Sequence, residues 1–423
     1  MVWEADTQEV DHVSDAASET QPEVNARLDR DVRWLFVLGG VSTAALLPFF
    51  SPLLLSRGLS PDRIGLVLSA MALASVVAAP LWSHEADTRL GTTRALVAST
   101  LATAGCAVLM IPTGSNGWTI AAAAVLMAAA AAPGTALGNA LALAVLGPDR
   151  ANDYGRIRRF ASLGWAVAVI AFGALCQAVG LWPVLPLYAG ALLFYAVYAR
   201  RFPSRAVLRD GDEHPGRLGA IGEAFRESPR LMPFLGGLLL LSVATSATDG
   251  FVPLQMLGAH GGPFLIGLAA GLAAVIEIPF FTWSAPLGSR FGMRNLFLAG
   301  AAVSIVTLIG YSLSHSPTQV AVFRTLAGAG FGLKYGALVV VTDRLVAHHL
   351  RNTGQTLMQL AQWSMGPIVG PAIGGFVYVI LGPPTLFAGA AAAASVGALV
   401  AWWALRGVGR ADEDSLQQSR GHR

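Results

Sequence analysis

Charged side chains are scarce in this sequence: Asp, Glu, Lys and Arg make up 13% of its 423 residues, whereas they make up roughly 25% of a soluble globular protein. This scarcity argues against a water-soluble fold. The charge is also unevenly spread, because nine of the 25 acidic residues lie between Glu4 and Asp31, while stretches 231–248 and 385–405 carry no charged residue. Stretches of that length are long enough to span a bilayer.

Cysteine is almost absent as well. Its two residues, Cys106 and Cys176, lie in apolar runs, so each is interpreted as a small core residue and neither implies a disulfide. The sequence also offers no clear metal-ligand cluster. His348 and His349 are adjacent, so their side chains diverge on any regular element, and neither a metal nor a cofactor is expected. The Arg residues form short clusters between apolar runs and no basic aromatic surface, which excludes nucleic acid as the reason for the net charge of +3.

Long apolar runs are what the sequence has in abundance. Runs of about 20 apolar residues predict membrane spans. They predict helices, because an open strand edge in lipid leaves backbone groups unpaired and the dyad alternation of a barrel strand is missing. The twelve predicted spans are 34–56, 63–83, 95–113, 118–146, 160–180, 183–200, 231–256, 263–285, 295–314, 318–342, 355–380 and 385–405.

The basic residues indicate the direction of these spans. With the amino terminus in the cytoplasm, 24 of the 28 Lys and Arg residues fall on the cytoplasmic side. Arg57 and Arg63 fall outside, and Arg324 and Lys334 lie inside a span. This bias predicts a multi-pass protein of the cytoplasmic (inner) cell membrane with both termini in the cytoplasm.

Polar segments divide the chain. Residues 1–33 are mostly polar and acidic and lack a basic n-region, so we expect a disordered cytoplasmic leader and no cleavable signal peptide. Residues 201–230 form the longest polar interruption and predict a cytoplasmic linker between two six-helix bundles, 34–200 and 231–405. Residues 406–423 are the expected cytoplasmic tail.

The loop pattern of the first six spans recurs in the second six. Pro80–Arg94 after the second span has its counterpart in Ala285–Arg294 after the eighth, and Asp149–Phe160 after the fourth corresponds to Asp343–Gln355 after the tenth. Equivalent loops on the same side of the membrane predict parallel repeats about an axis along the membrane normal, as in transporters of the major facilitator type.

Three segments carry a resemblance to a known family. Asp87–Arg94 resembles the signature loop between the second and third helices of the major facilitator superfamily. Tyr154–Trp165 is similar to the segment entering the fifth helix of its lactose permease and phenylpropionate permease group, and Glu277–Gly292 is similar to the eighth helix of the phenylpropionate members. The resemblance runs over all twelve predicted helices. It implies the major facilitator fold and a transporter of small organic solutes.

The signature loops have a mechanical interpretation as a cytoplasmic gate. Their charged side chains can make charge-assisted bonds across the cytoplasmic ends of the helices and so hold one of two access states. The candidate gate residues are Asp87, Arg89, Arg94, Arg290 and Arg294. Ser289 stands where an acid is expected in the second loop, so that half of the gate should be weaker.

Four ionisable residues lie clearly inside predicted spans: Asp249, Glu277, Arg324 and Lys334. Such a side chain costs several kcal/mol unless it is paired or hydrated, so each is a functional hypothesis, with balanced ion pairs as the alternative. Glu277 lies about fourteen residues into the eighth span, near mid-membrane. A carboxylate there can bind a hydroxylated solute or carry a coupling proton, and the resemblance implies the same role.

The resemblance adds Arg158 and Trp165 as substrate ligands. In the related permeases the matching Arg donates to the sugar and the matching Trp lies flat under its ring. The two residues are seven apart, which places them on one helix face. The alternative is that Arg158 belongs to a cytoplasmic cluster with Arg156 and Arg159 and that Trp165 packs against lipid.

Departures from that group matter too. Asn139, a candidate substrate ligand, lies beside Ala140, which stands where the group has its sugar-binding acid. Ala327–Gly330 lacks the His and Glu that the group links to proton movement, so lactose and its particular proton relay are in doubt. Arg324 stands where lactose permease has a Lys. Asp249 falls close to the position of the acid that pairs with this Lys in the permease. An Asp249–Arg324 pair, structural or functional, is therefore predicted.

Two glycine-rich segments resemble motifs of other protein classes. Gly328–Gly336 looks like a phosphate loop but lacks its spacing and lies in a span. Gly366–Gly375 has an antiporter-like Gly-Pro pattern, but in the eleventh helix. Close helix packing explains both better.

These observations predict a monomeric secondary active transporter that moves a small organic solute, a sugar or glycoside first, by alternating access and proton symport. Export of drugs or secondary metabolites is the alternative, and a non-transporting membrane sensor is a minor one. The expected partners are the solute, protons and the lipid bilayer. An enzyme would need a metal cluster or a nucleophile and base within the spans, and neither is visible.

Overall fold

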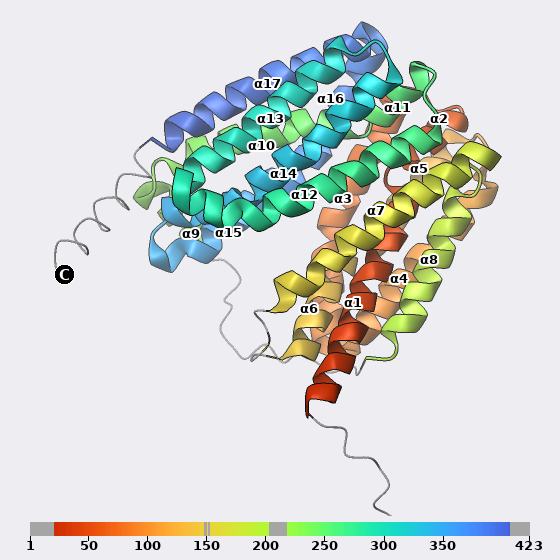
Figure 1. Ribbon diagram of the computed structural model, residues 1–423, viewed down its shortest axis with the longest axis horizontal. Helices are drawn as coiled ribbons and strands as arrows, with labels where there is room; N and C mark the ends of the chain where they lie inside the picture. The colour runs from red at the N-terminus through yellow and green to blue at the C-terminus, as the bar shows by residue number, and fades with distance from the viewer. Residues whose placement is uncertain (1–20, 148–149, 151–152, 203–217, 407–423) are drawn as a thin grey trace, which may run out of the picture.

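The chain folds into two helical bundles that lie side by side (Figure 1). The computed structural model describes residues 21–147, 150, 153–202 and 218–406, and these residues contain helices and no strand. The first bundle, here the N-half, consists of α1 (Gln21–Leu46), α2 (Phe50–Ser56), α3 (Pro61–Glu85), η1 (Ala86–Leu90), α4 (Thr92–Met110), η2 (Ile111–Thr113), α5 (Gly117–Ala131), α6 (Gly134–Leu146), α7 (Tyr154–Val179) and α8 (Val184–Ala199).

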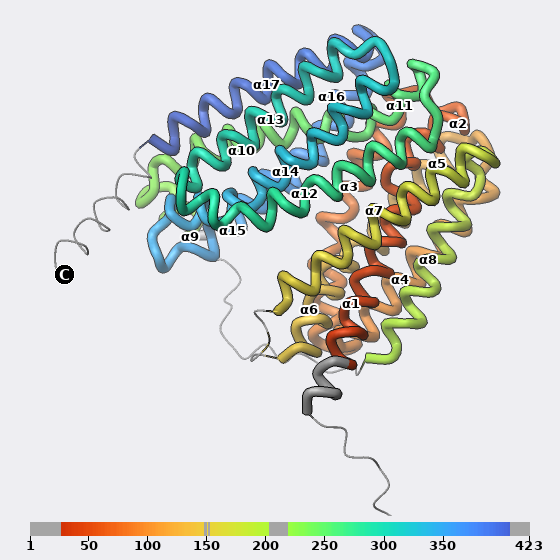
Figure 2. The backbone as a smooth tube through the Cα atoms, viewed as in Figure 1, coloured from red at the N-terminus to blue at the C-terminus, as the bar shows by residue number. Residues whose placement is uncertain are grey.

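The second bundle, the C-half, begins with a short helix that precedes its first span. Its elements are α9 (Leu218–Glu227), α10 (Leu231–Asp249), α11 (Val252–Gly258), α12 (Pro263–Phe291), α13 (Met293–Leu313), α14 (Pro317–Leu345), η4 (His348–Leu350), α15 (Arg351–Gln359), η5 (Leu360–Met365), α16 (Gly366–Leu381) and α17 (Pro383–Ala404). Figure 2 follows the path of the chain through both bundles.

Eleven helical stretches of the described chain are long and apolar enough to cross a membrane. The twelfth, α8, matches the predicted span 183–200 and is an apolar helix of 16 residues. The predicted fold class, an all-α membrane protein with two six-helix repeats, is confirmed. The helix α9 within the predicted linker 201–230 was not expected, and residues 203–217 of that linker lie outside the described residues.

The first helix begins much earlier than predicted. Residues 21–33, assigned from sequence to a disordered leader, are helical, and residues 1–20 lie outside the described chain. The reason is tertiary: Asp29 forms an ion pair with Arg150 and lies 3.7 Å from Arg33, while Val32 is fully buried. The Asp29 carboxylate also raises the pKa of the Arg150 guanidinium. A long-range charge pair therefore holds this polar turn in the helix.

The two halves repeat each other in detail. The first span is broken into α1 and α2, and the seventh is broken into α10 and α11; the short second helix has seven residues in both cases. The loop after the second span turns at Gly91 (φ 73°), and the loop after the eighth turns at Gly292 (φ 84°). Both glycines adopt the left-handed conformation that other residues rarely accept. The two halves thus share a break in their first span and a glycine turn after their second span.

The molecule has a basic end and a far end. The basic end is the one that carries Arg150, Arg200, Arg230, Arg290 and Arg406. The short helices α2 and α11 lie at the far end, where the two halves converge, whereas the halves diverge at the basic end (Figure 1). The molecule therefore opens toward the basic end.

Glycines allow the halves to meet closely toward the far end. A β-carbon on Gly173 of α7 would lie 2.8 Å from the Pro263 carbonyl oxygen of α12, and one on Gly375 of α16 would lie 2.6 Å from the Pro61 carbonyl oxygen of α3. Two hydrogen bonds between described residues also join the halves there. The Ala372 N–H donates to Ser69 Oγ (2.9 Å), and the Phe264 N–H donates to Gln177 Oε1 (3.4 Å).

Close packing also explains the two glycine-rich strings, as predicted. Within Gly328–Gly336, a β-carbon on Gly332 would lie 2.9 Å from the Glu277 carbonyl oxygen of α12. Within Gly366–Gly375, one on Gly370 would lie 2.7 Å from the Ala247 nitrogen of α10. Both strings are therefore helix contacts.

Candidate functional site

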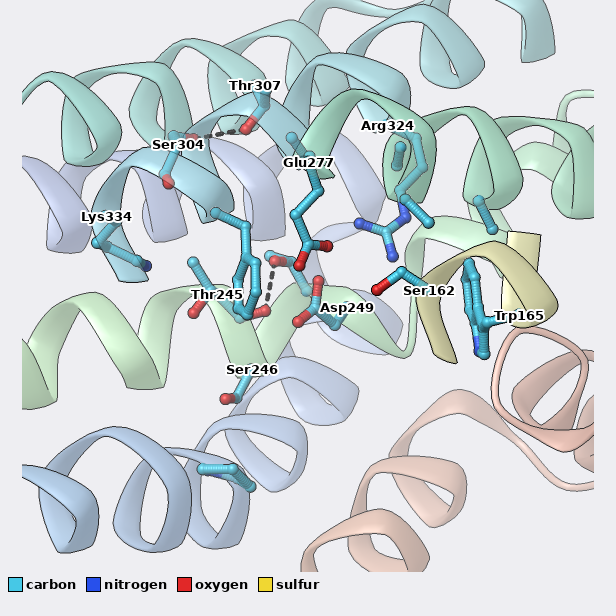
Figure 3. A pocket seen from close by; sticks show the side chains of 18 of the residues that line it. Ser162, Trp165, Thr245, Ser246, Asp249, Glu277, Ser304, Thr307, Arg324 and Lys334 are labelled. Atoms are coloured by element: carbon cyan, nitrogen blue, oxygen red, sulfur yellow. Dashed lines mark hydrogen bonds between the residues drawn. The ribbon is translucent and has the colours of Figure 1, made fainter. Parts of the chain in front are cut away.

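A cavity of about 530 Å³ lies between α7 of the N-half and the helices of the C-half; it is called the central cavity below. The C-half contributes most of its wall, from α10, α12, α13, α14 and η5, and the N-half contributes Trp165, Ser162 and neighbouring small residues. Figure 3 shows the labelled side chains pointing into it from several helices. Because both halves form its wall, a rearrangement of the halves must reshape the cavity.

Four charged side chains line the central cavity: Asp249, Glu277, Arg324 and Lys334. Glu277 is the middle residue of α12, which has 29 residues, and Asp249 is the last residue of α10. Arg324 and Lys334 are ten residues apart on α14, hence about 15 Å apart along its axis. The structure thus brings the four ionisable residues of the predicted spans to one cavity.

The charges are arranged as neighbours and not as closed ion pairs. Arg324 interacts electrostatically with both Glu277 and Asp249, and Figure 3 shows its guanidinium pointing toward the two carboxylates. None of these described side chains forms an ion pair within 4.0 Å of another. The predicted direct Asp249–Arg324 pair is therefore not formed in this conformation, because the cavity separates the helices that carry the two residues.

Lys334 is the most deeply buried of the four, with 5% of its surface exposed. Its charged neighbour is Asp249. A β-carbon on Gly300 of α13 would lie 2.8 Å from Lys334 Cβ, so the two helices confine this lysine closely.

Hydroxyl groups and aromatic rings complete the central cavity. Thr245, Thr248, Ser304 and Thr307 donate their hydroxyl hydrogens to carbonyl oxygens of their own helices, at 2.7 to 3.2 Å. Their oxygen lone pairs remain available to accept from a solute. On the side of the basic end, Phe331 stacks on Tyr335 with ring centroids 5.6 Å apart, and Trp363 packs edge-on against both rings.

A second cavity, of about 240 Å³, lies inside the N-half and is called the N-half cavity below. It is lined by Arg158, Asn139, Tyr188, Tyr195 and several Ser and Thr residues. Thr43 and Ala161 line both cavities, so the two adjoin. Arg158 also interacts electrostatically with Glu277 across the boundary between the halves.

The predicted substrate and charge residues are thus divided between two adjoining cavities. Trp165, Glu277, Asp249, Arg324 and Lys334 line the central cavity, while Arg158 and Asn139 line the N-half cavity. The Ser and Thr lining was not predicted, because single hydroxyl residues are common in apolar spans. Gln362 and Trp363 were also missed, although a Gln inside an apolar run was a usable signal.

The predicted gate residues all lie at the basic end, but they do not bridge the halves in this conformation. Arg89 lies 3.5 Å from Glu85 of its own helical segment, and the Arg290 guanidinium lies over the Phe291 ring. No hydrogen bond or ion pair of the described residues joins Asp87, Arg94 or Arg294 to the opposite half. Their role in the other access state stays a prediction.

One group in the described chain has an arrangement that could hold a metal ion. His349 Nε2 lies 3.4 Å from a Glu223 oxygen and 3.6 Å from a Glu227 oxygen, at the surface of the basic end. These contacts join α9 to η4 and are ion pairs when the His349 imidazole is protonated. His348, the adjacent histidine, is not part of the group.

Comparison with known proteins gives consistent results. The family described as MFS_1 like family matches residues 33–388 of this chain. The maltose permease of Geobacillus stearothermophilus is 27% identical to it over 341 residues, which cover 79% of this chain and 83% of that protein. The multidrug resistance protein MdtG of Serratia proteamaculans (strain 568) is 25% identical over 416 residues, which cover 93% of this chain and 98% of that protein.

A solved structure shares the fold. The nucleoside transporter NupG superposes on this chain with a TM-score of 0.76 at 17% sequence identity, covering 90% of this chain and 99% of that one. The likeness extends over both halves.

Proposed function

The chain belongs to the MFS_1 like family, and from that premise we propose that it is a secondary active transporter that moves a small organic solute across the inner cell membrane by alternating access. The observation that carries the proposal is the central cavity, whose wall comes from both halves and holds two carboxylates and two cations, with Glu277 at the middle of its helix. The names of the relatives, a maltose permease and a nucleoside transporter, support a transporter of hydroxylated solutes.

The proposed mechanism is a rocking of the two halves about the central cavity. We place the basic end in the cytoplasm because 24 of the 28 Lys and Arg residues fall on that side. The halves converge at the far end and diverge at the basic end, so the conformation described here is the inward-open one (Figure 1). Closing the basic end would bring the loop that holds Asp87 toward Arg290 and Arg294, where the Asp87 carboxylate could accept charge-assisted bonds from their guanidinium groups.

Glu277 is the proposed proton carrier. It lies at the middle of α12, faces the cavity and has two guanidinium neighbours, Arg158 and Arg324. A proton neutralises this carboxyl group, whose carbonyl oxygen can still accept a hydrogen bond from a solute hydroxyl, so the proton and the solute can bind together and move together. The proposed driving force is proton symport, carried out by a single copy of this chain.

Sugars and glycosides are the first substrate class to test. Trp165 offers a flat ring at the boundary between the halves, and the hydroxyl oxygens of the cavity accept hydrogen bonds from a polyol. The decisive experiment is a thermal-shift screen of the purified protein against sugars, glycosides, nucleosides and lipophilic cations, followed by counterflow in liposomes for each hit. Binding and counterflow of a hydroxylated solute are expected, and binding of none would refute this substrate class.

Proton-driven export is the second candidate. The match to a multidrug resistance protein over 98% of its length supports it, as does the aromatic group of Phe331, Tyr335 and Trp363 beside the cavity. Stabilisation by lipophilic cations alone in the same screen would favour this function over sugar uptake.

A further inference from the structure

The two adjoining cavities hold an uneven set of charges. Their charged lining residues are the acids Asp249 and Glu277 and the bases Arg158, Arg324 and Lys334. With all five in their ordinary charge states, one positive charge is in excess. The surplus matters in a membrane protein. When a cavity closes and loses its water, an unbalanced charge remains in surroundings of low polarity, which is energetically costly.

Arg158 is the base without a partner of its own. It makes no hydrogen bond or ion pair with any side chain in the part of the chain that the structure describes, and it is the only charged residue lining the N-half cavity. Its electrostatic neighbour Glu277 is shared with Arg324. The neighbouring arginines are engaged elsewhere: Arg156 binds Asp153 at 3.1 Å, and the Arg159 guanidinium lies over the Phe160 ring.

The other walls of the N-half cavity accept hydrogen bonds. Ser42, Thr100 and Thr103 donate their hydroxyl hydrogens to carbonyl oxygens of their own helices, each at 2.7 Å. Thr43 and Ser99 do the same at 3.0 Å. These oxygens therefore face the cavity with free lone pairs, which suits the hydroxyl groups of a solute. Asn139, Tyr188 and Tyr195 add hydrogen-bond donors to the lining, and Arg158 adds its one positive charge.

We propose that the transported solute is a hydroxylated organic monoanion, such as a sugar acid or glycuronide, whose carboxylate binds Arg158 while its hydroxyl groups donate to the Ser and Thr oxygens of the N-half cavity. The inference rests on the proposed transport function and specifies its substrate class. The guanidinium fork matches a carboxylate bidentately, and one carboxylate balances the one surplus charge of the cavities while Glu277 is ionised. The remainder of the solute extends past Thr43 and Ala161 into the central cavity, toward Trp165.

The test compares two probes that differ in one group. Methyl glucoside and methyl glucuronide have the same ring and the same configuration, but the second carries a carboxylate in place of the hydroxymethyl group. Their affinities are measured on the purified full-length protein by thermal shift and isothermal titration. We expect the glucuronide to bind about tenfold or more tightly than the glucoside, the effect of one charge-assisted bond, and this preference to vanish in Arg158→Gln.

A matched control keeps the result specific. Arg159→Gln removes the adjacent cation, which lies outside both cavities, and should leave the preference unchanged. Thr103→Val removes one acceptor and should weaken both probes equally. Arg158→Lys keeps the charge without the fork and should retain part of the preference, which preserves the test if Arg158→Gln does not fold.

Each outcome has a distinct meaning. Equal affinities for the two probes, or tighter binding of the glucoside, would overturn the monoanion proposal and leave the transport of hydroxylated solutes standing. A glucuronide preference that persists in a folded Arg158→Gln protein would overturn the assignment to Arg158. Binding of neither probe, nor of any other hydroxylated solute, would refute the proposed substrate class and this inference with it.

Discussion

Arg324 lies at the centre of the charge arrangement, because it is the neighbour of both Glu277 and Asp249. Lys334 has only Asp249 as its charged neighbour and is almost fully buried. The two cations are thus unequal: one is shared between two acids, and the other depends on one. We therefore expect the loss of Asp249 and the loss of Lys334 to change the stability of the protein by different amounts.

The first prediction concerns the dependence of Lys334 on Asp249. Asp249→Asn should lower the thermal unfolding temperature more than Lys334→Met, because it leaves a buried ammonium without a counter-charge, whereas Lys334→Met leaves Asp249 beside Arg324. Breaking a closed, fully buried ion pair costs about 3–5 kcal/mol. The loss here should be smaller, because Asp249 is exposed to the cavity and forms no ion pair with Lys334 within 4.0 Å. The double variant should recover much of the loss. Thermal unfolding of the detergent-solubilised protein measures all three, and equal effects of the single variants would contradict the assignment.

The second prediction concerns the proposed proton carrier. Glu277→Gln should abolish accumulation driven by a pH gradient in liposomes, because the amide cannot carry a proton, while exchange of the solute down its own gradient persists. Glu85→Gln is the matched control, since Glu85 lies at the basic end beside Arg89 and lines neither cavity. Normal accumulation in Glu277→Gln would remove this residue from the coupling.

At the scale of helices, the contact between the halves consists mainly of small residues. Gly65 of α3 packs directly against the Pro371 backbone of α16, and Gly173 and Gly267 bring α7 and α12 together. Such contacts are close but contain few polar bonds, so they can separate and reform. They hold the far end closed in this conformation without a network of ion pairs.

The third prediction tests that contact. Gly65→Ala should destabilise the far-end-closed state, because its methyl group would overlap the Pro371 carbonyl group. Gly105→Ala, in open space on α4, is the control. In a background without the two native cysteines, Ser246→Cys in the central cavity should react more slowly with an impermeant thiol reagent from the basic end when Gly65→Ala is present. An unchanged rate would show that the contact does not control access.

Helices and their number were predictable from the sequence because hydropathy dominates insertion into a membrane. The breaks after Leu46 and Asp249 were not, since the apolar runs continue across them. Nor was the helical start at Gln21, which depends on an ion pair between Asp29 and Arg150, residues 121 positions apart. In the candidate site, charged residues were found because they are rare in spans, whereas the hydroxyl lining carries no such signal.

On the scale of the whole molecule, each half is tied together at the basic end by its own charge pairs. In the N-half Arg150 joins the loop before α7 to α1 through Asp29. In the C-half His349 joins η4 to α9 through Glu223 and Glu227, a charge pair when its imidazole is protonated. The ties lie within halves and leave each bundle free to move as a unit.

The fourth prediction concerns orientation. In intact cells, Ser115→Cys at the far end should react with an impermeant thiol reagent, whereas His348→Cys at the basic end should react only after the cells are opened. Both positions are exposed, so accessibility of the membrane side alone decides the result. The reverse pattern would invert the proposed topology and turn the conformation described here into an outward-open one.

The mid-span position of the cavity charges has an electrical consequence. If the halves rock about the central cavity, Glu277 and its neighbours stay near the centre of rotation and cross little of the membrane field. An elementary charge moved across the whole field exchanges about 2.3 kcal/mol per 100 mV. The membrane potential therefore acts on the cargo and not on the empty carrier. Transport of a monoanion together with one proton moves no net charge across the membrane, whereas transport of a neutral glycoside with one proton produces a current.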